Sequence, residues 1–373
     1  MSILATYIRL YRLRSALIPL LMIIVGTACM IPSSDSPEDI PFGVELSEQF
    51  LNGLKQACGI EFSPEQLPQI ARLDEATIDS LSAQVDAFNR EYQLWRSLGF
   101  IETTRPQFVQ HRVGELQSLA GFYEPGQNIV WLRQDELSVA MKLVLAHELT
   151  HAWRILNGFA DTQAIRDEWS RPEASIAFRA GEEGIAIACT RSYFSQLSDE
   201  DRWAWHERLE QNDSSAVDTH PILEPFFGRA HGWVNVLGPE VIESHPRPLR
   251  ELVRVPTLIG STATLLGKPA AAAQTHVDLG PLLLREALVW SGVPWQNAEA
   301  IALGVIEDEL RWQSQQGDAD CLRVAIRYVE PKLATGRYLT AREAFERWSR
   351  FLDATVLESR DGYFVMESCI PEP

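Results

Sequence analysis

Along much of the chain, hydrophobic residues recur at steps of three and four, the spacing of one face of an α-helix. The first such segment begins at Glu45 and carries Leu46, Phe50 and Leu54 on one face. The same spacing continues through "SPEQLPQIARL" and up to Gly99, where a glycine is expected to end the last helix of this run.

Helical spacing returns in the second half of the chain. The segment that opens at Asp135 and Glu136 is predicted to be a helix ending at Gly158. Thr340 and Glu343 form a capping box, a signature of a helix N-terminus. The other predicted helices are residues 173–197, "DRWAWHERLEQ", "LGPLLLREALVWSG", "AEAIALGVIEDELRWQ" and the capped "TAREAFERWSRFLD".

One segment has a different pattern. In "GFYEPGQNIVWL", residues 121–132, two runs rich in β-branched and aromatic residues flank the turn-forming Pro125 to Asn128. This arrangement predicts a β-hairpin directly before the helix that ends at Gly158. The fold class expected from the sequence is therefore α+β, mostly helical, with a small β element near the middle.

The first residues have the features of a targeting segment. Arg9, Arg12 and Arg14 precede an apolar run, and "GTAC" then places small residues before Cys29. We expect residues 1–29 to form a signal peptide, lipoprotein segment or membrane anchor. The protein would then be attached to a membrane by this anchor or by lipid on Cys29. The alternatives are an uncleaved anchor and an ordinary buried helix. The leading expectation is an exported protein tethered to a membrane of the cell envelope.

The rest of the chain is expected to be one domain behind a tether. Residues 30–44 are rich in Pro, Ser and Asp and are predicted to be a flexible linker. No boundary signal divides residues 45–373. Within them we expect a helical N-terminal part over 45–115, a core over 116–200 and a helical C-terminal part over 201–373.

Charge and cysteine content limit the possible partners. The formal charge of −18 argues against nucleic acid, whose binding needs clustered positive charge. Outside the cytoplasm four cysteines would form two disulfides, with three possible pairings left open. Since no CxxC pair is present, a cysteine-based zinc site is not expected. The four are Cys58, Cys189, Cys321 and Cys369.

The chemistry is concentrated in "LVLAHELTHAWRI". His147 and His151 are four residues apart, so a helix places both imidazoles on one face, where they can hold one metal ion. Glu148 is rotated about 100° from His147 and can act as a general base without ligating the metal. The alternative is an amphipathic helix with two structural or surface histidines.

A zinc site needs a third protein ligand, and the next predicted helix offers Glu182 and Glu183. Helical spacing places Glu183 on a stripe with Ala180 and Ile187, but it does not exclude Glu182. Both glutamates are surface charges in the alternative interpretation. Gly184 is costly within a helix, and we expect it to allow close approach to the helix of His147.

The chain resembles the gluzincin-type zinc metallopeptidases, and more narrowly bacterial members that read "GFYxP", "HELTHA" and "EGxA". The matching residues lie at 121–125, 147–152 and 183–186, and "LGFI" at 98–101 is similar too. The resemblance implies a zincin-like fold with His147, His151 and Glu183 as zinc ligands and Glu148 as catalytic base. The chain lacks the late Gly-Trp-Gly-Gly-Asp-like stretch of such proteins and has "ALGVIEDEL" there.

The sequence thus leads us to expect a zinc metallopeptidase acting on a peptide or protein substrate. The alternatives are an exported metal-dependent hydrolase of another amide or ester, and a non-catalytic envelope lipoprotein. We expect Asn128 to Leu132 to be an edge strand that pairs with extended substrate. Candidates for stabilising the transition state, by residue type alone, are Tyr193, His220, His231 and His245.

Overall fold

The computed structural model describes residues 46–82, 85–133, 138–160, 171–212, 232–256, 258–267, 278–314, 319–331 and 339–371. The expected targeting segment 1–29, with Cys29, and the linker 30–44 lie outside these residues. Within the described ranges, no helix is both long and apolar enough to cross a bilayer.

The N-terminal part is helical, as predicted, except for one strand. Its helices are α2 (Glu48–Cys58), α3 (Glu75–Ser82), α4 (Val85–Ser97) and α5 (Arg105–Ser118). Gly99 follows α4 with φ of +79°, which suits glycine. The helical prediction for "SPEQLPQIARL" is wrong at its end, because Gln69–Arg72 forms strand β1. Four residues are too few to show a period, and the partner of β1 lies far along the chain.

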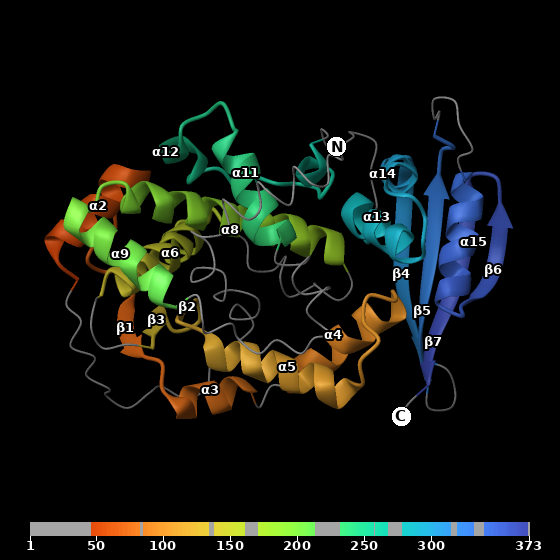
Figure 1. Ribbon diagram of the computed structural model, residues 1–373, viewed down its shortest axis with the longest axis horizontal. Helices are drawn as coiled ribbons and strands as arrows, with labels where there is room; N and C mark the ends of the chain where they lie inside the picture. Colours follow the sequence, from red (N-terminus) through yellow and green to blue (C-terminus); the bar gives the residue numbers. More distant parts are fainter. Residues whose placement is uncertain are drawn as a thin grey trace.

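The predicted hairpin is present. Strands β2 (Gly121–Glu124) and β3 (Ile129–Leu132) pair antiparallel, and β1 pairs parallel with β3. The strand order is β1-β3-β2, so β3 is central. The expectation that 128–132 forms an edge strand is therefore wrong, since both sides of β3 are already hydrogen-bonded. The edge strands of this sheet are β1 and β2 (Figure 1).

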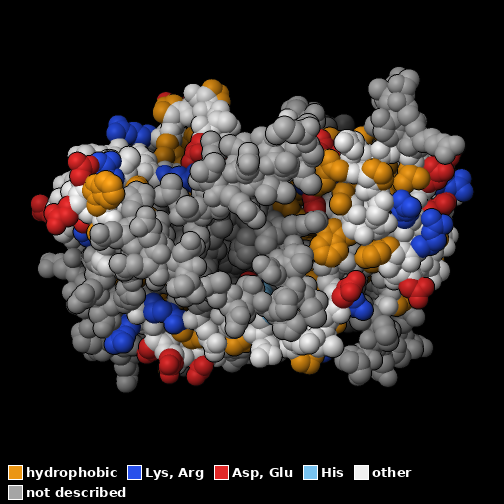
Figure 2. Space-filling view, in the orientation of Figure 1, with side chains coloured by type: hydrophobic (Ala, Val, Ile, Leu, Met, Phe, Trp, Pro, Cys, Tyr) orange, Lys and Arg blue, Asp and Glu red, His pale blue; other side chains and the backbone are white. Residues whose placement is uncertain are grey.

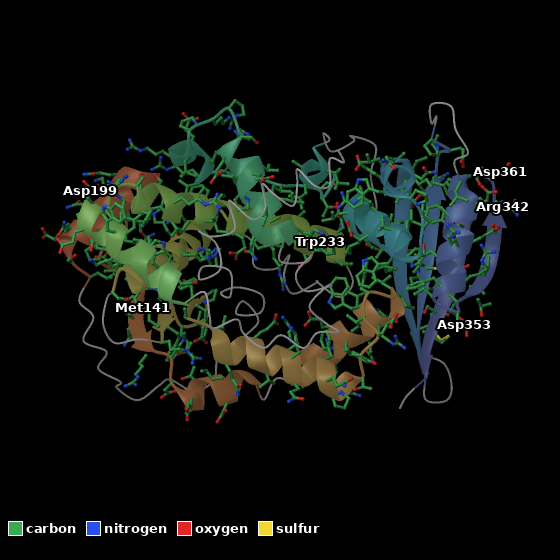
Figure 3. All side chains as sticks on the ribbon, viewed as in Figure 1. Met141, Asp199, Trp233, Arg342, Asp353 and Asp361 are labelled. Carbon is green, nitrogen blue, oxygen red and sulfur yellow. A yellow bond between two sulfur atoms is a disulfide. The ribbon has the colours of Figure 1, made fainter. Side chains whose placement is uncertain are left out.

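Two long buried helices form the centre of this part of the molecule. Helix α6 (Val139–Leu156) packs against the hairpin and against α8 (Pro172–Phe194). Gly158 follows α6 with φ of +70°, as expected of a helix stop. Around α8 lie α2, the π-helical turn η3 (Trp233–Leu237), α11 (Gly238–Glu243) and α12 (Leu249–Leu252). Helix α9 (Asp199–Asn212), another predicted helix, contacts α6. Figure 3 labels Met141 on α6 and Trp233 on η3.

Gly184 allows close helix packing, but its neighbour is α11 and not α6. A Cβ on Gly184 would lie 2.8 Å from the backbone of Gly238 and from the side chain of Ile242. A Cβ on Gly238 would in turn clash with the carbonyl oxygen of Ala180. The expectation that Gly184 serves approach to the helix of His147 is wrong, because Gly184 packs against α11 while its neighbour Glu183 meets His147.

This contact makes a testable prediction about stability. Gly184→Ala should lower the free energy of unfolding by about 1–3 kcal/mol, since the new methyl group meets backbone atoms. The matched control is Gly114→Ala in α5, where a Cβ has no neighbour within 4 Å. That control should raise stability by about 0.5–1 kcal/mol, the usual gain for a helix interior. Urea midpoints would show the opposite shifts, and two shifts of the same sign would contradict the packing.

The C-terminal part contains a second sheet, which the sequence did not indicate. Helices α13 (Gly280–Trp290) and α14 (Trp295–Leu303) lead into a four-stranded antiparallel sheet of order β4-β5-β7-β6. The 3₁₀ turn η4 (Thr264–Leu266) precedes them. The strands are β4 (Val305–Ser314), β5 (Ala319–Tyr328), β6 (Thr355–Arg360) and β7 (Tyr363–Pro371).

Two predictions are wrong in part. The helix predicted over "AEAIALGVIEDELRWQ" stops at Leu303, and the C-terminal part contains a sheet besides its predicted helices. Ile301, Val305 and Trp312 also fit helical spacing, which disguised the strand. In the folded chain Asp308 and Leu310 point inward from β4. Asp308 is buried because its carboxylate accepts backbone N–H bonds from 278–280. These partners are distant in sequence, so the local pattern did not reveal the strand.

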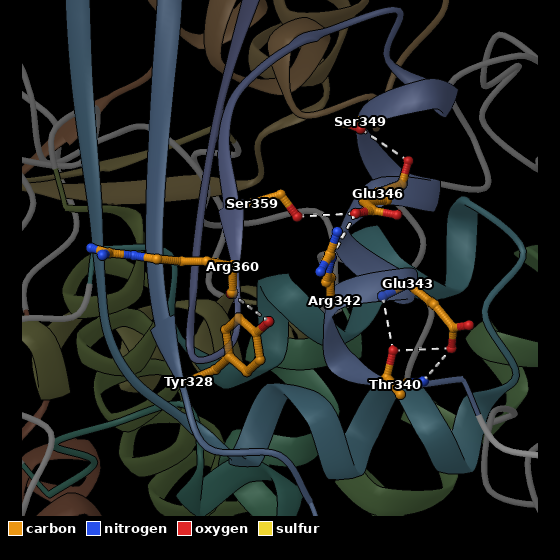
Figure 4. Close-up of polar contacts among 8 residues, drawn as sticks. All are labelled: Tyr328, Thr340, Arg342, Glu343, Glu346, Ser349, Ser359 and Arg360. Atoms are coloured by element: carbon orange, nitrogen blue, oxygen red, sulfur yellow. Dashed lines mark hydrogen bonds and ion pairs between the residues drawn. The ribbon is translucent and has the colours of Figure 1, made fainter.

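Helix α15 (Ala341–Phe351) covers one face of this sheet and begins as predicted (Figure 1). In Figure 4, Glu343 accepts from the Thr340 N–H at 2.8 Å, and the Thr340 hydroxyl accepts from the Glu343 N–H at 3.2 Å. The outer side of this end is charged. Figure 2 shows side chains of both signs together where α15 and β6 lie. Arg342 and Glu346 of α15 form an ion pair at 3.0 Å.

Hydrophobic packing and disulfides join these parts. The first half of α8 packs in the core beside α13, and its second half packs in the core around α6. Four cysteines allow three pairing schemes, and the structure has the one that joins Cys58 to Cys189 and Cys321 to Cys369. The first disulfide ties α2 to α8, and the second joins β5 to β7. The helix that carries Glu183 is therefore held covalently as well as by packing.

Candidate metal centre

The two histidines of the motif lie on one face of α6, as the spacing predicted. Ser138 caps the helix by accepting from the N–H of Met141. His147 and His151 are buried, and their Nε2 atoms are 3.1 Å apart. Two imidazole nitrogens this close point at one small volume. The alternative of two surface histidines is thus contradicted by their burial.

Glu183 reaches the same point from α8. Its Oε2 lies 3.1 Å from Nε2 of His147, and its Oε1 lies 3.3 Å from Nε2 of His151. Tetrahedral zinc with bonds of about 2.0–2.1 Å separates its ligand atoms by roughly 3.3–3.4 Å. The three side chains therefore offer donor atoms at a spacing close to that of the ligands of a small tetrahedral cation, and they could hold a metal ion. Three such ligands would leave one tetrahedral position open, as in catalytic zinc sites.

The three groups also perturb one another electrostatically. Burial alone would raise the pKa of Glu183, but the two imidazoles lower it to about 2. Burial alone would lower the pKa of His151, but the Glu183 carboxylate raises it above its usual value. The carboxylate thus stays ionised in the protein interior and provides the negative charge that a bound cation needs.

Glu148 lies beside this group and is held by the hairpin. Its Oε2 accepts the backbone N–H of Tyr123 in β2 at 3.0 Å. Its Oε1 is buried and has no hydrogen-bond partner among the described residues. Burial raises the pKa of Glu148 to about 8 in the metal-free site. One oxygen is therefore oriented by backbone, and the other remains available to accept a proton.

The choice between the two consecutive glutamates is explained by Arg154, which the sequence analysis did not single out. Glu182 forms a two-point ion pair with Arg154, with N–O distances of 2.8 and 2.7 Å. Both carboxylate oxygens of Glu182 are therefore engaged away from the histidines. Arg154 is seven residues after His147, so helical spacing had already placed it on the histidine face. That spacing was the available signal.

Tyr193 and His245, two of the four candidates for stabilising the transition state, are not brought to this group. Tyr193 packs on Phe50 of α2 and lies ten residues beyond Glu183, about 15 Å along α8. His245 accepts from the N–H of Arg247 in the turn after α11, beside Ala188. His220 and His231 lie outside the described residues.

The edge of β2 is the part of the sheet nearest the site. Ala120 and Arg133 form a hydrogen-bonded pair, because the Arg133 N–H donates to the Ala120 carbonyl oxygen. From this pair along the antiparallel hairpin, non-hydrogen-bonded and hydrogen-bonded pairs alternate. Gly121 and Tyr123 therefore direct their backbone groups away from β3. The Tyr123 N–H meets Glu148, which shows that this outer edge faces the site.

A second group of potential ligand atoms, Cys321, Glu367 and Cys369, lies in the C-terminal sheet. Both cysteines are in a disulfide, so they do not offer thiolates to a metal. Among the described residues this leaves His147, His151 and Glu183 as the group with three free ligands.

Comparison with family models, curated proteins and solved structures finds no match to this chain.

Proposed function

We propose that this protein is a zinc metallopeptidase of the gluzincin type with a zincin-like arrangement around α6, α8 and the hairpin. The observation that carries the proposal is the convergence of His147, His151 and Glu183 at the spacing of tetrahedral ligands. Glu148 supports it further, because a site built only to store metal has no use for an adjacent buried carboxylate.

The residues of the chain divide the chemistry between them. A zinc ion held by His147, His151 and Glu183 would supply Lewis acidity and make the attacking water more acidic. Glu148 accepts the proton of the attacking water on Oε1 and later donates it to the leaving amine. Tyr123 keeps the carboxylate in place through its N–H bond to Oε2. The buried surroundings of Glu148 keep bulk water from competing for that proton.

The proposed substrate is a peptide or protein in an extended conformation. β2 is an edge strand whose outer edge faces Glu148, and extended peptides are commonly recognised by strand addition at a sheet edge. In this proposal β2 takes the place first assigned to residues 128–132. The proposed setting is the cell envelope, with residues 1–29 as signal, anchor or lipoprotein segment, because a tethered peptidase meets exported substrates.

Metal content and peptide cleavage test the proposal together. We expect about one zinc per chain by elemental mass spectrometry, and cleavage of a mixed peptide library that a chelator stops and added zinc restores. Bound zinc with cleavage only of ester or non-peptide amide libraries would favour the other hydrolase. Bound zinc without turnover of either kind would favour a non-catalytic protein. A folded chain that takes up no zinc would remove the proposal.

The site also predicts a pH dependence. Zinc binding requires unprotonated imidazoles. The Glu183 carboxylate raises the pKa of His151, which favours the protonated imidazole over the neutral form that binds zinc. Protons therefore compete increasingly well as pH falls, and peptidase activity should decline below about pH 6. A rate profile at saturating substrate would show this. Activity unchanged down to pH 4 would contradict the assignment of the two histidines.

A further inference from the structure

The face of α6 that carries the two histidines continues with a third residue. His147, His151 and Arg154 follow one another at steps of four and three, so they form a single stripe. This stripe faces α8, where Glu182 and Glu183 are consecutive. Glu183 meets both histidines, and Glu182 meets Arg154. The contact between the helices thus includes two adjacent carboxylates with separate partners.

Arg154 is the most completely engaged side chain at this contact. It is fully buried, with 0% of its surface exposed. Besides the two bonds to Glu182, it donates to the carbonyl oxygens of Phe159, Val253 and Val255. One guanidinium therefore joins the end of α6, the middle of α8 and the turn after α12. The planar donor fork allows little rotation of any of them.

The position of Glu183 depends on the rotation of α8. Consecutive residues on a helix differ by about 100°, so a modest turn of α8 would withdraw Glu183 from the histidines and advance Glu182. A two-point ion pair resists such a turn because both bonds must be kept in one plane. The other side of α8 is limited by the close Gly184–Gly238 contact.

We propose that Arg154 and Glu182 form a positioning pair that sets the rotation of α8 and so places Glu183 as the third metal ligand. This inference rests on the proposed metal site. A purely stabilising role accounts less well for the pair, because buried ion pairs are often replaced by apolar side chains without loss of stability. Control of register is the better supported use of buried polar groups.

The test is the full-length double variant Arg154→Met/Glu182→Met, which removes the pair without leaving a buried charge. We expect it to fold, by circular dichroism, and to bind zinc about 10–100-fold more weakly, the usual cost of losing groups that orient ligands. The visible spectrum of bound Co²⁺ should also change, since it reports ligand geometry. The matched control is Arg112→Met/Glu91→Met, a buried pair joining α4 and α5, neither of which carries a ligand. It should bind both metals like the wild type.

A folded double variant with zinc affinity within about threefold of the wild type and an unchanged Co²⁺ spectrum would overturn the positioning role. If the double variant does not fold, Arg154→Lys decides in its place. Lysine keeps the charge but not the fork, so weaker zinc binding supports the proposal and unchanged binding overturns it. Failure of the proposed function looks different, because the wild-type chain itself would then take up neither Zn²⁺ nor Co²⁺.

Discussion

Glu148→Gln should reduce peptide hydrolysis by about 10²–10⁴-fold while the protein keeps its metal. Glutamine is nearly the same size and can still accept the Tyr123 N–H through its oxygen. It cannot take a proton from water, so the general-base step is lost. Glu148 is not one of the three residues that place a ligand atom at the shared point, so zinc content should be unchanged.

The measurement is kcat on a cleaved peptide, with zinc content determined on the same preparation. Glu243→Gln is the matched control, because this exposed residue of α11 undergoes the same chemical change and is paired with Arg191 of α8. It should leave both kcat and metal content unaltered. A Glu148→Gln enzyme that retains near wild-type kcat with bound zinc would remove Glu148 from the proposed mechanism.

Glu183→Gln should abolish tight zinc binding. An amide is a poor zinc ligand, and the site also loses the negative charge that compensates the cation. Zinc affinity should fall by more than about a hundredfold, since disturbing only the groups around the ligands costs about 10–100-fold. The stabilisation by zinc should fall with it, because zinc at 100 times its Kd contributes about 2.7 kcal/mol to the folded state.

Competition with a chromogenic chelator and thermal unfolding with and without zinc would measure both effects. Glu240→Gln, an exposed glutamate of α11, serves as the control and should respond to zinc like the wild type. If Glu183→Gln still binds about one zinc tightly and is stabilised by it, the third ligand lies elsewhere. That result would also remove the reason for a positioning pair behind Glu183.

Features that depend on neighbours in the sequence were predictable. The pair His147 and His151 needs only one helical turn to converge, and the hairpin needs only the turn at 125–128. The capping box at Thr340 is likewise complete within four residues. In each case the partner groups are so close along the chain that local geometry alone brings them together.

Features that depend on distant partners were not predictable. Strand β1 has only four residues and is defined by pairing with the distant β3, so it shows no decisive period of its own. The close neighbour of Gly184 is Gly238, 54 residues later, which no pattern around Gly184 indicates. In the second sheet, β4 pairs with the next strand, β5, but its apolar residues also fit helical spacing, and only the β5–β7 pairing joins distant segments.

The third ligand lies between these cases. Spacing limited it to Glu182 or Glu183 but did not separate them, and preference for Glu183 rested on the resemblance to gluzincins. The tertiary structure separates them by supplying Arg154, which engages both oxygens of Glu182 and leaves Glu183 for the histidines.

The sequence by itself determined the helix that carries His147, Glu148 and His151, because residues four apart on a helix always share a face. Only the tertiary structure decided which glutamate of α8 joins them and which strand edge faces Glu148. Those outcomes depend on how α8 rotates against α6 and on which strand takes the centre of the sheet. Both are settled by contacts between segments far apart in the chain, which local spacing does not encode.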